Sequence, residues 1–199
     1  MTTTEWELLD QAYATLREAA LGVPADGWDR PTPCAQWNVT QVLQHAAGDQ
    51  LAYAARLTGG PGPTEDPFAP SGALAGTPAG LLDPALAAAA AAFAGVAPGD
   101  VEVAVPLPPF SVPAETAVGA AALDAAVHAW DIAVATGRPP GLTDALAAAL
   151  RPAADVLVEP LRGFAYGPVR SLAPGADDGA AARLLALLGR DPDWAAPAA

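Results

Sequence analysis

Residues 122–131, which read ALDAAVHAWD, are the stretch around which the rest of this chain can be interpreted. Most of these residues are apolar, and among the polar ones Asp124 and His128 stand four residues apart. On an α-helix two such side chains lie one above the other, with Cβ atoms roughly 5–6 Å apart. That spacing suits two side chains that hold one metal ion. The chain has one other histidine, His45, and we expect the fold to bring it to this pair.

Apolar residues recur at helical spacing along most of the chain. Asn38 and Thr143 stand where N-caps belong, and a capping-box signature begins at Thr4. Residues 101–105 alternate like a short strand, and Pro152 is expected to kink or split its helix. The pattern predicts helices over residues 4–22, 39–57, 81–96, 115–136, 143–158 and 178–188.

Segments rich in proline and glycine separate the predicted helices. Residues 24–37 contain three prolines, and residues 60–80 form a long loop that is either a lid over a site or simply mobile. The helices are long enough for an up-and-down four-helix bundle with extra helices at the C-terminus. We therefore predict an all-α fold and a single domain over residues 1–199.

The charge composition excludes several classes of function. The chain has a formal net charge of -13 and scattered arginines without any lysine, so neither nucleic acid nor an anionic membrane is an expected partner. A Schiff base on lysine is excluded for the same reason. The single cysteine permits no intrachain disulfide, and the N-terminus does not resemble a signal peptide. We expect a cytoplasmic monomer or homodimer that acts on a small-molecule substrate.

The two histidines and Asp124 form a candidate metal site. Two imidazole nitrogens and one carboxylate oxygen suit Zn²⁺, and three protein ligands leave one position open for catalysis. The alternative is that His45 and His128 are ordinary residues, one in the core and one at the surface. Asp131, three residues after His128, either orients that ring by accepting its second N–H or braces a neighbouring loop. For Asp49, four residues after His45, solvent exposure is the favoured interpretation.

Two tryptophans and the cysteine are further candidates. Trp37 and Trp130 are candidate cofactor-binding residues that line a pocket, although tryptophans at helical spacing belong to the core more often. Cys34 precedes a helix N-terminus, a placement that favours a reactive thiolate. A buried structural thiol is nevertheless the favoured interpretation, and we do not predict nucleophilic catalysis by Cys34.

Three segments resemble one known family. Residues 31–45, with TPCAQWNV followed by Leu43 and His45, resemble the TPC-x-x-W-x-V…L-x-x-H segment of mycothiol-dependent maleylpyruvate isomerase-like proteins of the DinB superfamily. Residues 123–137 resemble their D/E-x-x-x-H-x-W-D-L-A-x-A-T-G segment. Residues 183–192 resemble the C-terminus of an actinobacterial metal-binding branch of that group. The resemblance implies a DinB-like four-helix bundle with a divalent metal, often zinc.

The resemblance also implies ligands and a function. The metal would be held by His45, Asp124 and His128, with Asp where the isomerase has Glu. His45, His128 and Asp131 would then serve catalysis by a transferase or isomerase that attacks a small electrophilic metabolite. The metal would lower the pKa of a cofactor thiol such as mycothiol. The isomerase's separate C-terminal domain is not evident, which argues against assigning the same reaction.

Two other functions remain open at this point. One is a metal-independent biosynthetic enzyme whose histidines act as general acid and base. The other is a small-molecule-binding or resistance protein that holds its ligand under residues 60–80.

Overall fold

The computed structural model describes residues 6–173, 175 and 178–196, and this part of the chain is almost entirely helical. A short hairpin, β1 (Val103–Ala104) and β2 (Ser111–Val112), precedes α4, and a 3₁₀ turn, η1 (Glu159–Leu161), follows α5. The all-α prediction is confirmed. The α-helices are α1 (Glu7–Leu21), α2 (Val39–Thr58), α3 (Pro78–Phe93), α4 (Ala114–Ala135), α5 (Asp144–Leu157) and α6 (Ala180–Leu187).

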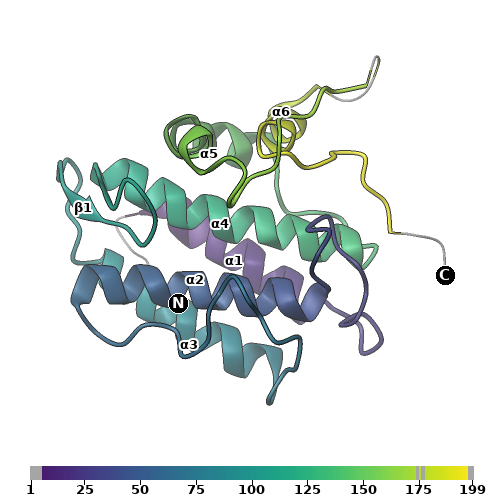
Figure 1. Ribbon diagram of the computed structural model, residues 1–199, viewed down its shortest axis with the longest axis horizontal. Coiled ribbons are helices and arrows are strands. Elements are labelled where there is room, and N and C mark those ends of the chain that lie inside the picture. Colours follow the sequence, from purple (N-terminus) through teal and green to yellow (C-terminus); the bar gives the residue numbers. More distant parts are fainter. Residues whose placement is uncertain (1–5, 174, 176–177, 197–199) are drawn as a thin grey trace.

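Helices α1 to α4 form a four-helix bundle, in which α4 packs against α1 and α2 while α3 packs against the same two helices. Helices α5 and α6 pack against each other, and α5 covers the face of α4 opposite α2 (Figure 1). These are the extra C-terminal helices that the sequence predicts. Helix α4 is therefore enclosed on both sides.

The helix directions refine the predicted up-and-down bundle. Gly22 at the end of α1 lies against Arg138 just beyond α4, so these two helices run in the same direction. At the start of α1, the indole N–H of Trp6 donates to the Val96 carbonyl just after α3, at 3.3 Å, so α3 runs the opposite way. Residues 59–77 carry the chain from the end of α2 back to its start, where Gln41 contacts Pro70. Helices α2 and α3 therefore run in the same direction (Figure 1).

Capping side chains place the helix starts where the sequence predicts them. The Asn38 side chain accepts from the Gln41 backbone N–H at 2.9 Å, and the Gln41 side chain accepts from the Asn38 N–H at 3.0 Å. Thr143 caps α5 by accepting from the Leu146 N–H at 3.2 Å. Thr4, the other predicted cap, lies outside the described residues. These caps satisfy backbone donors that the first turn of a helix leaves open.

Pro152 does not split its helix, since α5 continues through it as one element. Proline removes one backbone hydrogen bond, and the carbonyl that loses its partner belongs to Ala148, four residues earlier. Both residues lie on the exposed face of α5, where water can hydrate that carbonyl. The opposite face, with Leu150 and Ala154, is buried and keeps the helix in place.

Helix α4 is long and apolar enough, by length and composition alone, to cross a membrane. However, 89% of its most apolar window is buried inside the protein. An α-helix that is apolar all round occurs in the core of a protein as well as in a membrane. The surrounding helices therefore account for the hydropathy of α4.

Residues 59–77 are attached to α2, as a lid would be. Gln41 and Gln44 donate side-chain hydrogen bonds to three acceptors in this segment, at 3.0–3.1 Å. Gly48 allows close approach, since a Cβ atom there would lie 3.0 Å from the Pro67 ring. The segment therefore covers the part of α2 that carries His45.

Candidate metal centre

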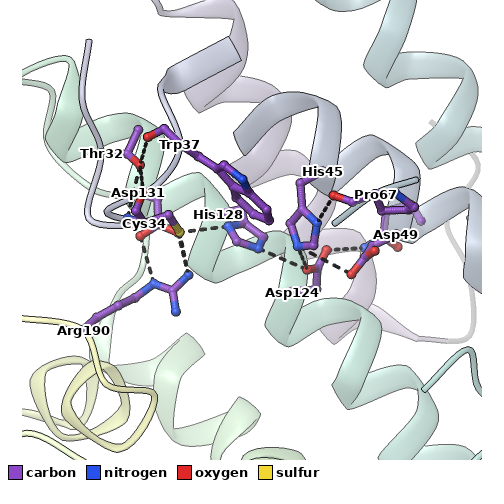
Figure 2. Close-up of polar contacts among 11 residues, drawn as sticks. Thr32, Cys34, Trp37, His45, Asp49, Pro67, Asp124, His128, Asp131 and Arg190 are labelled. Atoms are coloured by element: carbon purple, nitrogen blue, oxygen red, sulfur yellow. Dashed lines mark hydrogen bonds and ion pairs between the residues drawn. The ribbon is translucent and has the colours of Figure 1, made fainter. Parts of the chain in front are cut away.

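His45 of α2 meets Asp124 and His128 of α4, which share one face of that helix (Figure 2). Asp124 Oδ1 lies 3.3 Å from His128 Nε2 and 3.8 Å from His45 Nε2. One ligand atom from each residue lies within 4.8 Å of the other two. The two histidine side chains are 6% and 8% exposed, so these groups meet in the interior.

The other nitrogen of each imidazole has its own partner. His45 Nδ1 lies 2.9 Å from the Pro67 carbonyl oxygen, and His128 Nδ1 lies 2.9 Å from Asp131 Oδ2. Both oxygens can only accept, so each Nδ1 carries the proton and donates it. In the neutral ring Nε2 then presents a lone pair, and both lone pairs are on the side of Asp124.

This donor set fits a divalent cation. Two imidazole lone pairs and a carboxylate oxygen are all acceptors, and acceptors that converge in a protein interior need a positive group between them. A tetrahedral zinc ion with ligands at about 2.0–2.2 Å separates its ligand atoms by roughly 3.3–3.6 Å. The separations at Asp124 Oδ1, 3.3 and 3.8 Å, are close to this range.

Asp49 lies beside this centre, which corrects the expectation that it faces solvent. Its Oδ2 is 3.7 Å from His45 Nε2, and its side chain is only 14% exposed. Four residues along α2 place it on the same face as His45, and that face turns toward α4. Burial, followed by the nearby Asp124, raises the pKa of the Asp49 carboxyl well above its usual value.

A buried glutamine fixes the orientation of Asp124. Gln50 is 0% exposed, and its amide N–H donates to Asp124 Oδ2 at 3.0 Å and to the Ala121 carbonyl at 3.2 Å. Its carbonyl accepts from the Tyr13 hydroxyl at 2.6 Å, so the amide cannot flip without losing these bonds. One carboxylate oxygen is thus engaged, and Oδ1 is left for the two histidines. A glutamine within the apolar stripe of α2 was the available sequence signal for this role.

The two histidines differ in their affinity for a proton. Burial, together with the neighbouring His128, lowers the pKa of His45 to about 4. Burial also opposes protonation of His128, but the Asp124 and Asp131 carboxylates outweigh it and raise the pKa of His128 well above its usual value. Burial likewise acts against ionisation of Asp124, yet the two histidines and Gln50 lower its pKa overall.

Asp131 both orients His128 and joins a second cluster, so its two predicted roles coexist. It is 0% exposed and accepts from Arg190 Nε at 2.9 Å, from Arg190 Nη2 at 2.8 Å and from the Cys34 thiol at 3.2 Å (Figure 2). Burial would raise the pKa of Asp131, but Arg190 and His128 hold it well below its usual range. The burial of Arg190 could not be predicted from the sequence, because an arginine beyond the last helix carries no local signal of burial.

A cavity of about 340 Å³ opens on these groups. One part of its wall is polar and includes His45, Asp124 and His128, and Cys34 also borders the cavity instead of being sealed in the core. The Trp37 ring lies 4.6 Å from the His45 ring, as measured between centroids. The remainder of the wall is largely apolar or aromatic, with Tyr53, Phe68, Val105, Leu107, Leu157, Leu161, Phe164 and Tyr166.

Of the two predicted cofactor-binding tryptophans, the structure brings Trp37 to the cavity and places Trp130 elsewhere. Trp130 is 3% exposed and belongs to the hydrophobic core, and it is not among the described residues that line the cavity. It follows His128 by two residues, which turns it about 200° around α4, away from the metal centre. The pocket-lining prediction for Trp130 is therefore wrong.

Comparisons with known proteins agree with this architecture. Residues 9–133, from α1 through nearly all of α4, match the model of the mycothiol maleylpyruvate isomerase N-terminal domain. Two proteins of Mycobacterium tuberculosis, from strains CDC 1551 / Oshkosh and H37Rv and both named as uncharacterized, are 34% identical over 140 residues, which is 69% of this chain and 70% of theirs. No solved structure matches the chain significantly. The chain belongs to the mycothiol maleylpyruvate isomerase N-terminal domain family, within the DinB-like superfamily.

Proposed function

We propose that the protein binds a divalent metal ion, with Zn²⁺ the best fit, and is a thiol-dependent transferase or isomerase. Its family indicates a mycothiol-related, DinB-like function. The observation that carries the metal proposal is the placement of two imidazole Nε2 atoms around one oxygen, Asp124 Oδ1, at 3.3 and 3.8 Å. Both Nδ1 atoms are engaged elsewhere, which leaves the two Nε2 atoms to face Asp124.

The surrounding charges support a divalent ion over a monovalent one. Asp124 supplies one negative charge beside His45, and a bound cation would favour ionisation of the neighbouring Asp49 as a second. Two carboxylates and two neutral imidazoles balance a dication, which reduces the cost of holding charge in the interior. In this proposal His45, Asp124 and His128 are ligands, and Asp131 holds the His128 ring in the ligating orientation.

A bound metal would lower the pKa of the cofactor thiol, because a thiol that coordinates a metal is deprotonated at neutral pH. The protein's own part is to place the substrate against that sulfur and to exclude water. Aromatic side chains above the site serve this purpose, since the Phe68 ring lies 5.3 Å from the His45 ring and 5.0 Å from the Phe164 ring, as measured between centroids. Phe68 belongs to the segment attached to α2, and so that segment forms part of the site.

The size of the cavity restricts the substrate. At about 340 Å³ it is at the lower end of the range of ligand pockets, which runs from about 300 to 1,000 Å³. We infer that the substrate is a small electrophilic metabolite and that mycothiol is the candidate thiol. We expect neither nucleic acid nor a membrane as a partner. A cytoplasmic monomer or homodimer is part of the same proposal.

Spectroscopy of the Co²⁺-loaded protein tests the thiol step. Adding mycothiol should produce a sulfur-to-cobalt charge-transfer absorption in the wild-type protein and in Arg151→Ala, whose exposed side chain pairs with Asp155 on α5. His128→Ala should show neither the cobalt spectrum nor the new absorption. A cobalt spectrum that mycothiol leaves unchanged would overturn the thiol part and leave the metal part standing.

A further inference from the structure

Arg190 reaches the metal centre from the far end of the chain. Its Nε and Nη2 donate to the two oxygens of Asp131, at 2.9 and 2.8 Å, as a bidentate pair. Nη2 also donates to Cys34 Sγ at 3.2 Å (Figure 2). Asp131 links Arg190 to His128, because its Oδ2 also accepts a hydrogen bond from His128 Nδ1 at 2.9 Å. One guanidinium therefore joins α4, the segment before α2 and the chain beyond α6.

The end of α6 delivers Arg190 to this position. The Arg190 N–H donates to the Leu185 carbonyl at 2.9 Å, and the Gly189 N–H donates to the Ala186 carbonyl at 3.1 Å. This pair of bonds is a Schellman motif, which requires a left-handed residue after the helix, and Gly189 has φ +84°. Gly189 also lies against Gly167, where an added Cβ would be 2.8 Å from backbone atoms. The backbone geometry at Gly189 thus directs the Arg190 side chain toward Asp131.

We propose that Arg190 is a positioning residue for the metal centre, which sets the His128 ring through Asp131. The proposal rests on the proposed function, in which His128 is a ligand. Asp131 is 0% exposed, and a buried carboxylate needs a fixed counter-charge to keep one orientation. Because Arg190 donates to both oxygens of Asp131, Oδ2 of Asp131 stays directed at His128 Nδ1. The lone pair of His128 Nε2 then stays directed at the ion.

Removal of Arg190 should therefore weaken metal binding without removing a ligand. Groups that orient a ligand histidine typically change metal affinity by about 10- to 100-fold. A general loss of stability would not alter the ligand geometry around a bound ion, whereas rotation of the His128 ring would. The visible spectrum of bound Co²⁺ separates these two cases because it reports coordination geometry.

The test is a Co²⁺ titration of the full-length wild-type protein, Arg190→Gln and Arg170→Gln. Arg170 is the matched control, since it pairs with Asp191 in the same terminal segment at 3.1 Å but is 49% exposed. We expect Arg190→Gln to bind Co²⁺ at least about tenfold more weakly and with an altered spectrum. Arg170→Gln should match the wild-type protein in both. Wild-type affinity and spectrum in Arg190→Gln would overturn the proposal.

Crystal structures of the metal-free wild-type and Arg190→Gln proteins provide a second arm. The expected result is that the Asp131 carboxylate turns and the 2.9 Å contact to His128 Nδ1 is lost. An unchanged contact would overturn the proposal. If the wild-type protein bound no Co²⁺, the proposed function would fail, and these two structures alone would decide the role of Arg190.

Discussion

The imidazole rings of His45 and His128 meet edge to face, with planes at 88° and centroids 4.7 Å apart. They come from different helices, and each is fixed through Nδ1 by a separate acceptor. The two rings are not stacked face to face, and both Nε2 atoms lie beside Asp124 Oδ1. The surrounding residues maintain this arrangement.

Gln50→Leu should weaken metal binding and destabilise the fold. The change leaves Asp124 Oδ2 and the buried Tyr13 hydroxyl without their partner, which should cost about 1–3 kcal/mol in the free energy of unfolding. Freed from Gln50, Asp124 can rotate, and metal affinity should fall about tenfold. Urea unfolding and a Co²⁺ titration measure the two effects.

Tyr13→Phe is the control for Gln50, because it keeps the bond from Gln50 to Asp124 and removes only the hydroxyl. It should lower stability but keep metal affinity near that of the wild-type protein. Equal losses of affinity in Tyr13→Phe and Gln50→Leu would contradict the orienting role of Gln50.

Gly189→Ala should be more destabilising than its left-handed conformation alone explains. Gly189 and Gly163 both have φ +84°, but a Cβ atom meets Gly167 backbone at 2.8 Å only at Gly189 and finds nothing within 4 Å at Gly163. Gly163→Ala should thus cost only the left-handed penalty, about 1–2 kcal/mol. Gly189→Ala should cost more and should also weaken Co²⁺ binding. Thermal unfolding of both variants checks this, and equal costs would contradict it.

His45 should make the metal-free protein less stable as the pH falls from 6.5 toward 4. The pKa of His45 is about 4 in the folded protein against an ordinary value of 6.5, so in this window the unfolded chain binds a proton that the folded protein does not. Linkage then gives a loss of about 3 kcal/mol from His45 alone across the window, and the raised pKa of Asp49 opposes it, because the folded protein keeps a proton on Asp49 that the unfolded chain has released. The raised pKa of His128 acts above pH 6.5, and the lowered pKa of Asp131 acts near the acid end and below it.

Urea unfolding at pH 7 and pH 4.5, with chelator present, isolates this effect of His45. His45→Asn should show a smaller loss of stability than the wild-type protein between the two pH values. The same loss in both proteins would show that His45 is not the responsible group.

Asp49→Asn should weaken metal binding without removing a predicted ligand. Its carboxylate lies 3.7 Å from His45 Nε2, so its charge acts on an ion at this centre over a short distance. Loss of one such charge should lower affinity on the order of tenfold. Asp26→Asn, which removes an exposed carboxylate that pairs with Arg30, is the charge-matched control and should have no effect. A competition titration with a chelating dye measures both.

The helices and the Asp124/His128 pair could be predicted because helical periodicity and a four-residue spacing are local properties. The expectation that His45 joins the pair rested instead on its being the other histidine of the chain and on the family resemblance. The sequence did not predict that Asp49 is buried, because that depends on how α2 turns toward α4. The contact of Arg190 with Asp131 could not be predicted for a similar reason, since the two residues are distant in sequence. Trp130 was misplaced because an apolar residue beside a site residue can face either way on a helix that is buried all round.

In the proposed function, His45, Asp124 and His128 together hold one divalent metal ion. The most direct measurement is the metal content, by elemental analysis, of wild-type and His45→Ala protein purified side by side without chelator. We expect about one equivalent of a divalent metal per wild-type chain, a value typical of a single site, and almost none in His45→Ala. Equal metal content in the two proteins, or none in the wild-type protein, would contradict it.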